Sequence, residues 1–237
     1  MRNGELIGGS AGLLAAGGWL AHAVRGRAST VFGPSVYHGD RARPAIALTF
    51  DDGPSESTPA LLNILARHQV PATFFLCGQN VERLPGIARA VAAAGHEIGN
   101  HSDSHPRFDF RSSEFIHREL AQAQEKILLH TGVKPRLFRA PYGVRWFGLK
   151  SAQERLGLMG VMWGTMGNDW KWPAPRIARL LLRRARNGEI VCLHDGRRTE
   201  PAPNIEATLE AVDAVIPQLK ERGLRFETVG QILCPAT

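Results

Sequence analysis

Cysteine is scarce in this chain, and the sequence contains no internal repeat and no low-complexity tract. The 237 residues include three cysteines, Cys77, Cys192 and Cys234, an odd number without the spacing of metal ligands. A cysteine-based metal site therefore has no support, and Cys77 and Cys192, which lie in apolar runs, are expected to be buried and inert. Without repeats, one domain of the size of an α/β barrel is the expected architecture.

Motifs of nucleic-acid binding are also missing, although the chain is basic. Lys and Arg outnumber Asp and Glu by 29 to 22, so the formal net charge is +7. Such a balance suits an anionic surface such as lipid head groups or an acidic cell-wall polymer. The arginines, for example Arg176, Arg179 and Arg183, are mostly spread over predicted helix faces, and solvated surface is the simpler explanation. We expect no nucleic-acid partner.

The longest apolar run lies at the start of the chain. Residues 6–24 are rich in Gly and Ala and approach the length of a membrane span, but five glycines interrupt them. Ala21-His22-Ala23 also fits a signal-peptide cleavage site. A cleaved export signal, a membrane anchor and a helix packed on the domain remain open. We favour export or anchoring at the cell envelope, without excluding a cytoplasmic location, and divide the chain into this segment (1–24), an irregular lead-in (25–43) and a folded domain (44–237).

From Pro44 onward, short apolar segments alternate with amphipathic ones. Apolar segments bounded by turn residues predict strands, and apolar residues with a period of 3.6 predict helices. Strands are expected at 45–48, 72–77, 97–100, 137–139, 158–163, 189–193 and 224–226. Helices are expected after an N-cap at Thr58 and over 81–94, 113–129, 147–156, 175–185 and 204–220. This alternation implies a parallel sheet covered by helices, either a barrel or an open sheet.

Ionisable residues, which are aspartates, histidines and one arginine, follow the predicted strands. They are Asp51 and Asp52 after the first strand, His101 and His105 after the third, Arg139 at the end of the fourth, Asp169 after the fifth and His194 after the sixth. In a parallel barrel the C-terminal ends of the strands converge on one face, where such folds place their active sites. We therefore expect these residues to meet although they are far apart in the sequence.

The residue types in this set favour a metal site. Asp51 and Asp52, adjacent at the mouth of an apolar strand, repel each other and are costly to desolvate, so a bound cation is the natural remedy. A turn in which they cap backbone groups is the simpler alternative. His101 and His105, four residues apart, can reach one ion. With one carboxylate they make a three-ligand site that leaves positions open for water and substrate, as in catalytic sites.

Five motifs in this order resemble the polysaccharide deacetylases with a NodB-type homology domain, carbohydrate esterase family 4. They are Thr-Phe-Asp-Asp-Gly-Pro (49–54), His-Ser-Asp-Ser-His (101–105), Arg-Ala-Pro-Tyr-Gly (139–143), Asp-Trp (169–170) and Cys-Leu-His (192–194). The resemblance covers about residues 44–234. It implies a distorted (β/α)7 barrel with the active site at the C-terminal ends of the strands. It also implies metal-dependent removal of acyl groups from amino sugars or, in some members, from acetylated hydroxyls.

The resemblance assigns the metal and the base to the first two motifs. Asp52, His101 and His105 would hold one divalent ion, and Asp51, paired with Arg139, would be the general base. A carboxylate bound to a cation cannot also accept protons efficiently, whereas its neighbour can. Two imidazoles and one carboxylate suit Zn2+, and Co2+ or Ni2+ would fit the same ligands.

The later motifs would supply the acid and the substrate contacts. By resemblance His194 would protonate the departing amine, with Asp169 holding its imidazole, and the main-chain N–H of Tyr142 would help to stabilise the oxyanion. The segment before Asp169 lacks the acidic residues that family members often show, so a simple loop cap remains an alternative for Asp169. Trp170 either lines the sugar site, together with Tyr142, or plugs the barrel.

The substrate expected from the resemblance is an N-acetylated glycan such as peptidoglycan or a chitin-type oligosaccharide. A lipid-linked sugar or a small non-sugar amide would use the same motifs, and a non-catalytic sugar-binding module is a further alternative. A glycosidase would leave the histidines unused. An aspartyl-phosphate enzyme lacks its phosphate-binding glycine loop and partner lysine. We expect a monomer, with membrane association through the N-terminal segment.

Overall fold

The computed structural model describes residues 16–233. Within this range the strands form one sheet in the order β1-β6-β5-β4-β3-β2-β8-β7, with β9 paired to β2, and all these pairings are parallel. The strands are β1 (Ser35–Val36), β2 (Ala45–Gly53), β3 (Thr73–Leu76), β4 (Glu97–Asn100), β5 (Leu137–Phe138), β6 (Met159–Val161), β7 (Thr165–Met166), β8 (Glu189–His194) and β9 (Arg225–Phe226).

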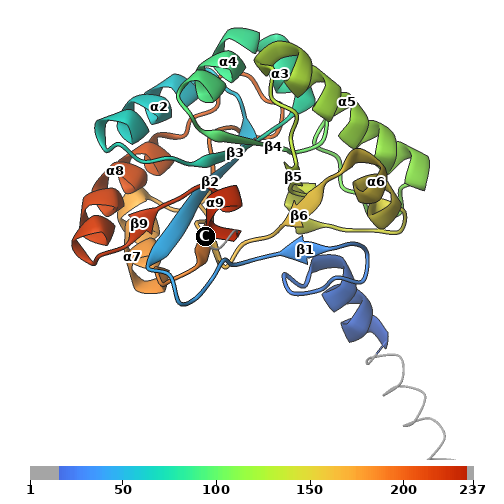
Figure 1. Cartoon of the computed structure of the whole chain (residues 1–237), viewed down its shortest axis with the longest axis horizontal. Coiled ribbons are helices and arrows are strands. Elements are labelled where there is room, and N and C mark those ends of the chain that lie inside the picture. The colour runs from blue at the N-terminus through green and yellow to red at the C-terminus, as the bar shows by residue number, and fades with distance from the viewer. Residues whose placement is uncertain (1–15, 234–237) are drawn as a thin grey trace, which may run out of the picture.

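Helices cover the outer face of this sheet, which curls into an incomplete barrel with β1 and β7 as its terminal strands (Figure 1). The helices are α2 (Thr58–Arg67), α3 (Gly78–Arg83), α4 (Pro85–Ala93), α5 (Ser113–Thr131), α6 (Leu149–Leu156), α7 (Ala174–Arg184), α8 (Glu206–Glu221) and α9 (Val229–Leu233), with a 3-10 turn, η1, at Pro141–Gly143. The predicted distorted barrel is therefore confirmed.

Strand β2 lies in the middle of the sheet and separates the barrel interior from the helical layer. Ala45 and Ala47 belong to the interior cluster, whereas Leu48 and Phe50 pack beneath the helices. Because successive side chains of a strand point to opposite faces, the same alternation turns Asp51 inward. The small alanines at the beginning of β2 and the carboxylate at its end thus share one face.

A β-bulge at Asp52 ends this alternation. The register with β3 shifts there, because Asp51 pairs with Phe75 while Gly53 pairs with the adjacent Leu76. Asp52 is the extra residue and has a φ of +73°, a conformation that Asp tolerates better than most residues. In a regular strand Asp52 would point away from Asp51. The bulge allows both carboxylates to reach the same end of the barrel.

Helix α9, which the sequence pattern did not predict, lies at the other end of the barrel. The main-chain N–H of Val229 donates to the hydroxyl of Thr73 (2.9 Å), and that of Gly230 donates to the carboxylate of Glu97 (3.0 Å). Thr73 and Glu97 are the first residues of β3 and β4. Helix α9 therefore packs against the N-terminal ends of the strands and leaves the C-terminal ends free for a site.

Two predicted helix boundaries are wrong. The segment 81–94 holds two helices, α3 and α4, rather than one, because Pro85 lacks an N–H and forces Leu84 out of the helical conformation (φ −128°, ψ 55°). Thr58 is the first residue of α2 and not its N-cap. Its hydroxyl instead donates to the buried carboxylate of Asp195 (2.6 Å).

The N-terminal end of the described chain is a helix over residues 16–25, which Figure 1 shows leading away from the barrel. Its first seven residues are exposed, among them Trp19 and Leu20. The described part of the chain contains no helix long and apolar enough to cross a membrane. Most of the predicted leader, residues 1–15, lies outside the described residues.

The segment that follows this helix is held on the barrel by Arg145, which is buried. Its guanidinium donates to the main-chain oxygens of Gly26 and Ser29 and to the hydroxyl of Ser35 (2.9 Å). Its own main-chain N–H donates to the carbonyl of Val24 (3.0 Å). The lead-in before β2, expected to be irregular, thus contributes β1 and packs on the rest of the fold.

Candidate active site

A pocket of about 610 Å³ opens at the C-terminal ends of the strands. Most of the residues that the sequence singled out line it: Asp51, Asp52, His101, His105, Tyr142, Trp170 and His194. Arg139 and Asp169 lie just behind the lining, both buried, and hydrogen-bond to it. The structure therefore brings all the predicted site residues together in one place.

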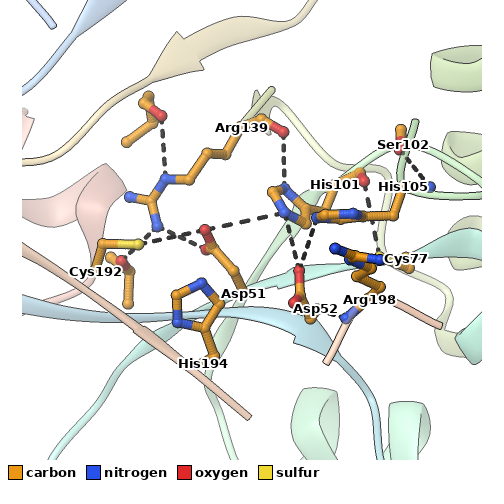
Figure 2. Close-up of polar contacts among 12 residues, drawn as sticks. Asp51, Asp52, Cys77, His101, Ser102, His105, Arg139, Cys192, His194 and Arg198 are labelled. Atoms are coloured by element: carbon orange, nitrogen blue, oxygen red, sulfur yellow. Dashed lines mark hydrogen bonds and ion pairs between the residues drawn. The ribbon is translucent and has the colours of Figure 1, made fainter. Parts of the chain in front are cut away.

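The side chains of Asp52, His101 and His105 point toward one another (Figure 2). Nε2 of His101 and Nε2 of His105 lie 3.3 Å and 3.0 Å from Oδ1 of Asp52, and the three potential ligand atoms lie within 4.8 Å of one another. His101 directly follows β4, and His105 lies four residues further on with a φ of +59°. One ion could contact all three side chains.

The hydrogen bonding around these side chains fits a cation. Nδ1 of His101 lies 2.8 Å from the main-chain oxygen of Arg139. Because a carbonyl can only accept, Nδ1 carries the proton, and Nε2 of the neutral ring presents a lone pair. This lone pair faces Oδ1 of Asp52, a buried oxygen that has no hydrogen-bond donor among the described residues. Acceptors that face one another in a buried site need a shared cation, and a divalent metal ion meets that need.

The carboxylate of Asp52 is held in one orientation. Its Oδ2 accepts the main-chain N–H of Arg198 (2.7 Å), and its main-chain oxygen accepts from the side chain of Asn80 (2.7 Å). The sequence pattern did not predict these contacts of Arg198 and Asn80.

Asp51 is bonded to a fully buried arginine. Nη1 of Arg139 donates to Oδ1 of Asp51 (2.7 Å) and to the hydroxyl of Thr49 (2.7 Å), and its Nε donates to the carbonyl of Val161 (3.1 Å). The thiol of Cys192 lies 3.4 Å from the other oxygen of Asp51. Arg139 is thus no surface ion-pair residue. Its charge faces the carboxylate of Asp51, and the hydrogen bond between them fixes the direction of that carboxylate.

His194 stands beside Asp51, because the two residues are register partners in β8 and β2. Nδ1 of His194 lies 2.9 Å from Oδ1 of Asp169, whose Oδ2 accepts the main-chain N–H of His194 (2.8 Å) and the hydroxyl of Thr208 (2.7 Å). Burial lowers the pKa of His194, but the charge and hydrogen bond of Asp169 outweigh it and raise the pKa to about 9. Asp169 is therefore more than a loop cap. Thr208, on α8, had no sequence signal.

Two aromatic rings border the pocket. The ring of Tyr142, in η1 with a φ of +57°, lies 4.7 Å from that of His105. The ring of Trp170 meets His194 edge-on at 5.0 Å. Tyr142 is 40% and Trp170 47% exposed, so Trp170 is not a plug of the barrel. Both rings have surface available to a ligand in the pocket.

Helix α5 supports the loop between the two histidines. The carboxylate of Glu119, which is buried, accepts the main-chain N–H groups of Asp103 (3.1 Å) and Ser104 (2.9 Å) and the hydroxyl of Ser104 (2.9 Å). Nζ of Lys126 lies 3.0 Å from Asp103. Neither α5 residue was predicted as part of the site. The available signal was that Glu119 follows Ile116 by three residues and so lies on the buried face of the helix.

The fold and the site define an α/β barrel with a cluster of carboxylates and imidazoles, able to hold a cation, at the ends of its strands, and comparison with known proteins identifies the family. The polysaccharide deacetylase family model matches residues 38–161. The peptidoglycan-N-acetylglucosamine deacetylase PgdA of Listeria monocytogenes is 35% identical over 189 residues, which are 79% of this chain and 38% of that protein. A chitooligosaccharide deacetylase of a Bradyrhizobium species is 35% identical over 197 residues, 79% of this chain and 90% of the relative.

A solved structure gives the same result. The crystal structure of the peptidoglycan N-acetylglucosamine deacetylase Bc1960 superposes with a TM-score of 0.79 at 34% identity, and the match covers 84% of this chain and 92% of that one. The chain therefore belongs to the polysaccharide deacetylases of carbohydrate esterase family 4. It spans less than half the length of the Listeria relative.

Proposed function

We propose that this protein is a metal-dependent hydrolase that removes N-acetyl groups from amino-sugar residues of a glycan. The convergence of Asp51, Asp52, His101, His105 and His194 on one pocket carries the proposal. These side chains provide a cation site, a proton acceptor and a proton donor. The relatives named for deacetylation of peptidoglycan and of chitooligosaccharides support an N-acetylated glycan as the substrate.

In this proposal Asp52, His101 and His105 hold the metal, and Asp51 is the base. A divalent cation, for which Zn2+ suits this donor set and Co2+ or Ni2+ would also fit, supplies Lewis acidity to the developing negative charge. Asp51 accepts a proton from the attacking water. Arg139 fixes the direction of Asp51 through the 2.7 Å bond to Oδ1.

The leaving nitrogen also needs a proton, and in this proposal the imidazolium of His194 donates its own. Its bond to Asp169 occupies Nδ1, so Nε2 is the atom that donates. Without this proton the nitrogen would have to depart as an anion, which is a much poorer leaving group than the neutral amine. The main-chain N–H of Tyr142 would stabilise the oxyanion, and the rings of Tyr142 and Trp170 would contact the sugar.

The same proposal assigns a role to each segment of the chain. Residues 44–237 would form the catalytic NodB-type domain, with the lead-in packed on it. Residues 1–24 would be an export signal or membrane anchor, which would bring the site to glycans of the cell envelope. The exposure of Trp19 and Leu20 on the N-terminal helix supports such a role, because the described part of the fold does not cover them.

Acetate release by the metal-loaded protein tests the proposal. We expect turnover of an N-acetylated chitooligosaccharide or of peptidoglycan, loss of turnover with a chelator, and recovery with Zn2+ or Co2+. Asp51→Asn should keep the metal and lose activity by about 10²–10⁴-fold, whereas Asp52→Ala should lose the metal. Metal analysis of both variants gives the control, and equal metal loss in both would show that the division between base and ligand is wrong.

A negative assay would also be informative. If the metal-loaded protein releases no acetate from any N-acetylated glycan, the proposed function is wrong. Turnover of a lipid-linked sugar or a small non-sugar amide would then identify a different substrate for the same site. Glycan binding without any turnover would identify a sugar-binding protein that has kept the fold.

A further inference from the structure

Three arginines line the pocket without taking part in the chemistry proposed above. They are Arg25, at the end of the N-terminal helix, and Arg197 and Arg198, in the loop after β8. Within residues 16–233, none of the three forms an ion pair with a carboxylate. Other arginines of the fold do form such pairs, as Arg43, Arg107 and Arg139 do. The charges at the pocket rim are therefore available to a ligand.

Arg198 lies nearest to the cation site. Its main-chain N–H donates to Oδ2 of Asp52, and its guanidinium carbon lies 5.7 Å from the ring centre of Tyr142. Figure 2 shows Arg139 and Arg198 on opposite sides of the two aspartates in that view. Arg139 is buried and paired, whereas Arg198 is exposed, so only Arg198 of these two can meet a substrate.

Arg197 and Arg25 add charge at the same rim. The guanidinium of Arg197 donates only to main-chain oxygens, those of Gly196 (2.8 Å) and Asp169 (3.4 Å), which leaves its charge without a counter-ion. Arg25 is exposed and follows Val24, whose carbonyl is held by Arg145. Two segments far apart in the sequence thus place positive charge on one pocket.

The acidic residues of the pocket do not cancel this charge. Asp51 is paired with Arg139, and Asp52 lies at the proposed cation site, where a bound divalent ion would offset its charge. Glu200 is the remaining carboxylate in the described lining, against three arginines. The planar fork of a guanidinium fits a carboxylate or a phosphate through paired hydrogen bonds, and a neutral N-acetylglucosamine polymer offers neither.

From this arrangement we infer that the site selects glycans that carry an anionic group, a carboxylate or a phosphate, close to the reacting N-acetyl group. The inference rests on the proposed function. Arg198 would be the main contact because it is closest to the cation site, and Arg25 and Arg197 would add to the attraction. A neutral chitooligosaccharide would then be the poorer substrate.

Substrate competition tests the inference with the metal-loaded full chain. The probes are neutral N-acetylchitotetraose, a peptidoglycan glycan strand, whose muramic acid residues carry carboxylates, and an N-acetylglucosamine oligosaccharide with a terminal phosphate. We expect kcat/KM for at least one anionic probe to exceed that for the neutral probe by tenfold or more. The ratio should fall as salt rises, since exposed charges are screened. The anionic probe with the higher kcat/KM shows whether the site prefers a carboxylate or a phosphate on the glycan.

Variants show whether the arginines cause the preference. Arg198→Gln and Arg25→Gln should each lower the anionic-to-neutral ratio several-fold, mainly through KM, and Arg198→Lys should restore part of it. Arg89→Gln, on the exposed side of α4, is the matched control and should keep the ratio. A ratio near one in the parent protein, or a ratio that both pocket variants leave unchanged, would overturn the inference.

A binding measurement separates this inference from the proposed reaction. Calorimetry with Asp51→Asn reports affinity for the three probes without turnover. Preferential binding of an anionic probe that Arg198→Gln abolishes supports the inference even if no acetate is released in the assay above. Equal affinity for all three probes, or no binding of any, overturns it while leaving a positive acetate assay intact.

Discussion

The pairing of His194 with Asp169 sets the pH range in which the proposed proton donor is protonated. Because Asp169 raises the pKa of His194 to about 9, the protonated imidazole is present below that pH and is lost above it. We predict that kcat/KM falls as the pH rises through about 9. Asp169→Asn removes the charge that raises the pKa, so the alkaline fall should begin at a lower pH. A pH–rate profile of both proteins checks this, and an alkaline limb that does not move would show that another group controls it.

The buried pair of Arg139 and Asp51 makes a prediction about stability. Removing one partner leaves an uncompensated charge inside the barrel, where the pair is 0% and 3% exposed. We expect Arg139→Met to lower the free energy of unfolding by about 3–5 kcal/mol. The double variant with Asp51→Asn should be less destabilised than Arg139→Met alone.

Urea unfolding in the presence of a chelator measures both effects without a contribution from metal binding. The two single variants and the double variant complete a thermodynamic cycle. Additive losses would mean that the two side chains do not stabilise each other in the folded protein.

Helix α5 supports the loop that carries His105. Glu119 fixes the main chain of the loop that carries His105, without touching the cation site itself. We expect Glu119→Ala to weaken metal affinity by roughly 10–100-fold, the usual effect of losing an outer-shell hydrogen bond. Glu125→Ala, an exposed position on the same helix, should leave metal affinity unchanged. Metal titration with a competing chelator provides the measurement, and equal affinities for both variants would assign Glu119 to folding alone.

Elements with a clear apolar period were predictable, whereas those fixed by tertiary contacts were not. The apolar run at 45–48 located β2, which continues to Gly53, and the spaced apolar residues over 113–129 predicted α5 to within two residues of its observed end. Strand β7 and helix α9 are too short to show a period. Each is held by a neighbour distant in the sequence, and α9, for example, is bonded to Thr73 and Glu97.

The same distinction holds within the site. Asp51, His101 and His194 were predictable because each follows an apolar strand and the ends of parallel strands meet. Arg198 was not predictable, since its bond to Asp52 joins residues 146 positions apart. The bond also uses only the main-chain N–H, which every residue except proline possesses. The bulge at Asp52 was equally hidden, because Asp-Asp-Gly-Pro reads only as the end of a strand.

For the whole molecule, the attachment of the N-terminal segment is the feature most open to test. Arg145 joins Gly26, Ser29 and Ser35 to the barrel, so Arg145→Met should release the segment before β2 while the barrel stays folded. We predict faster proteolysis and faster hydrogen exchange within residues 24–36 only. Mass spectrometry locates both changes. Protection that remains at wild-type level would show that the strand pairing of β1 is sufficient by itself.

The bulge in β2 has a mechanical consequence. Since the proposed base and the proposed ligand are consecutive residues of one strand, flexing of the barrel would displace Asp51 and Asp52 together, and the gap between the proposed proton acceptor and a bound ion would change little. The proposed proton donor, His194, belongs to the adjoining strand β8. In the proposed reaction, relative movement of β2 and β8 would therefore alter the delivery of the proton to the leaving amine and not its removal from water.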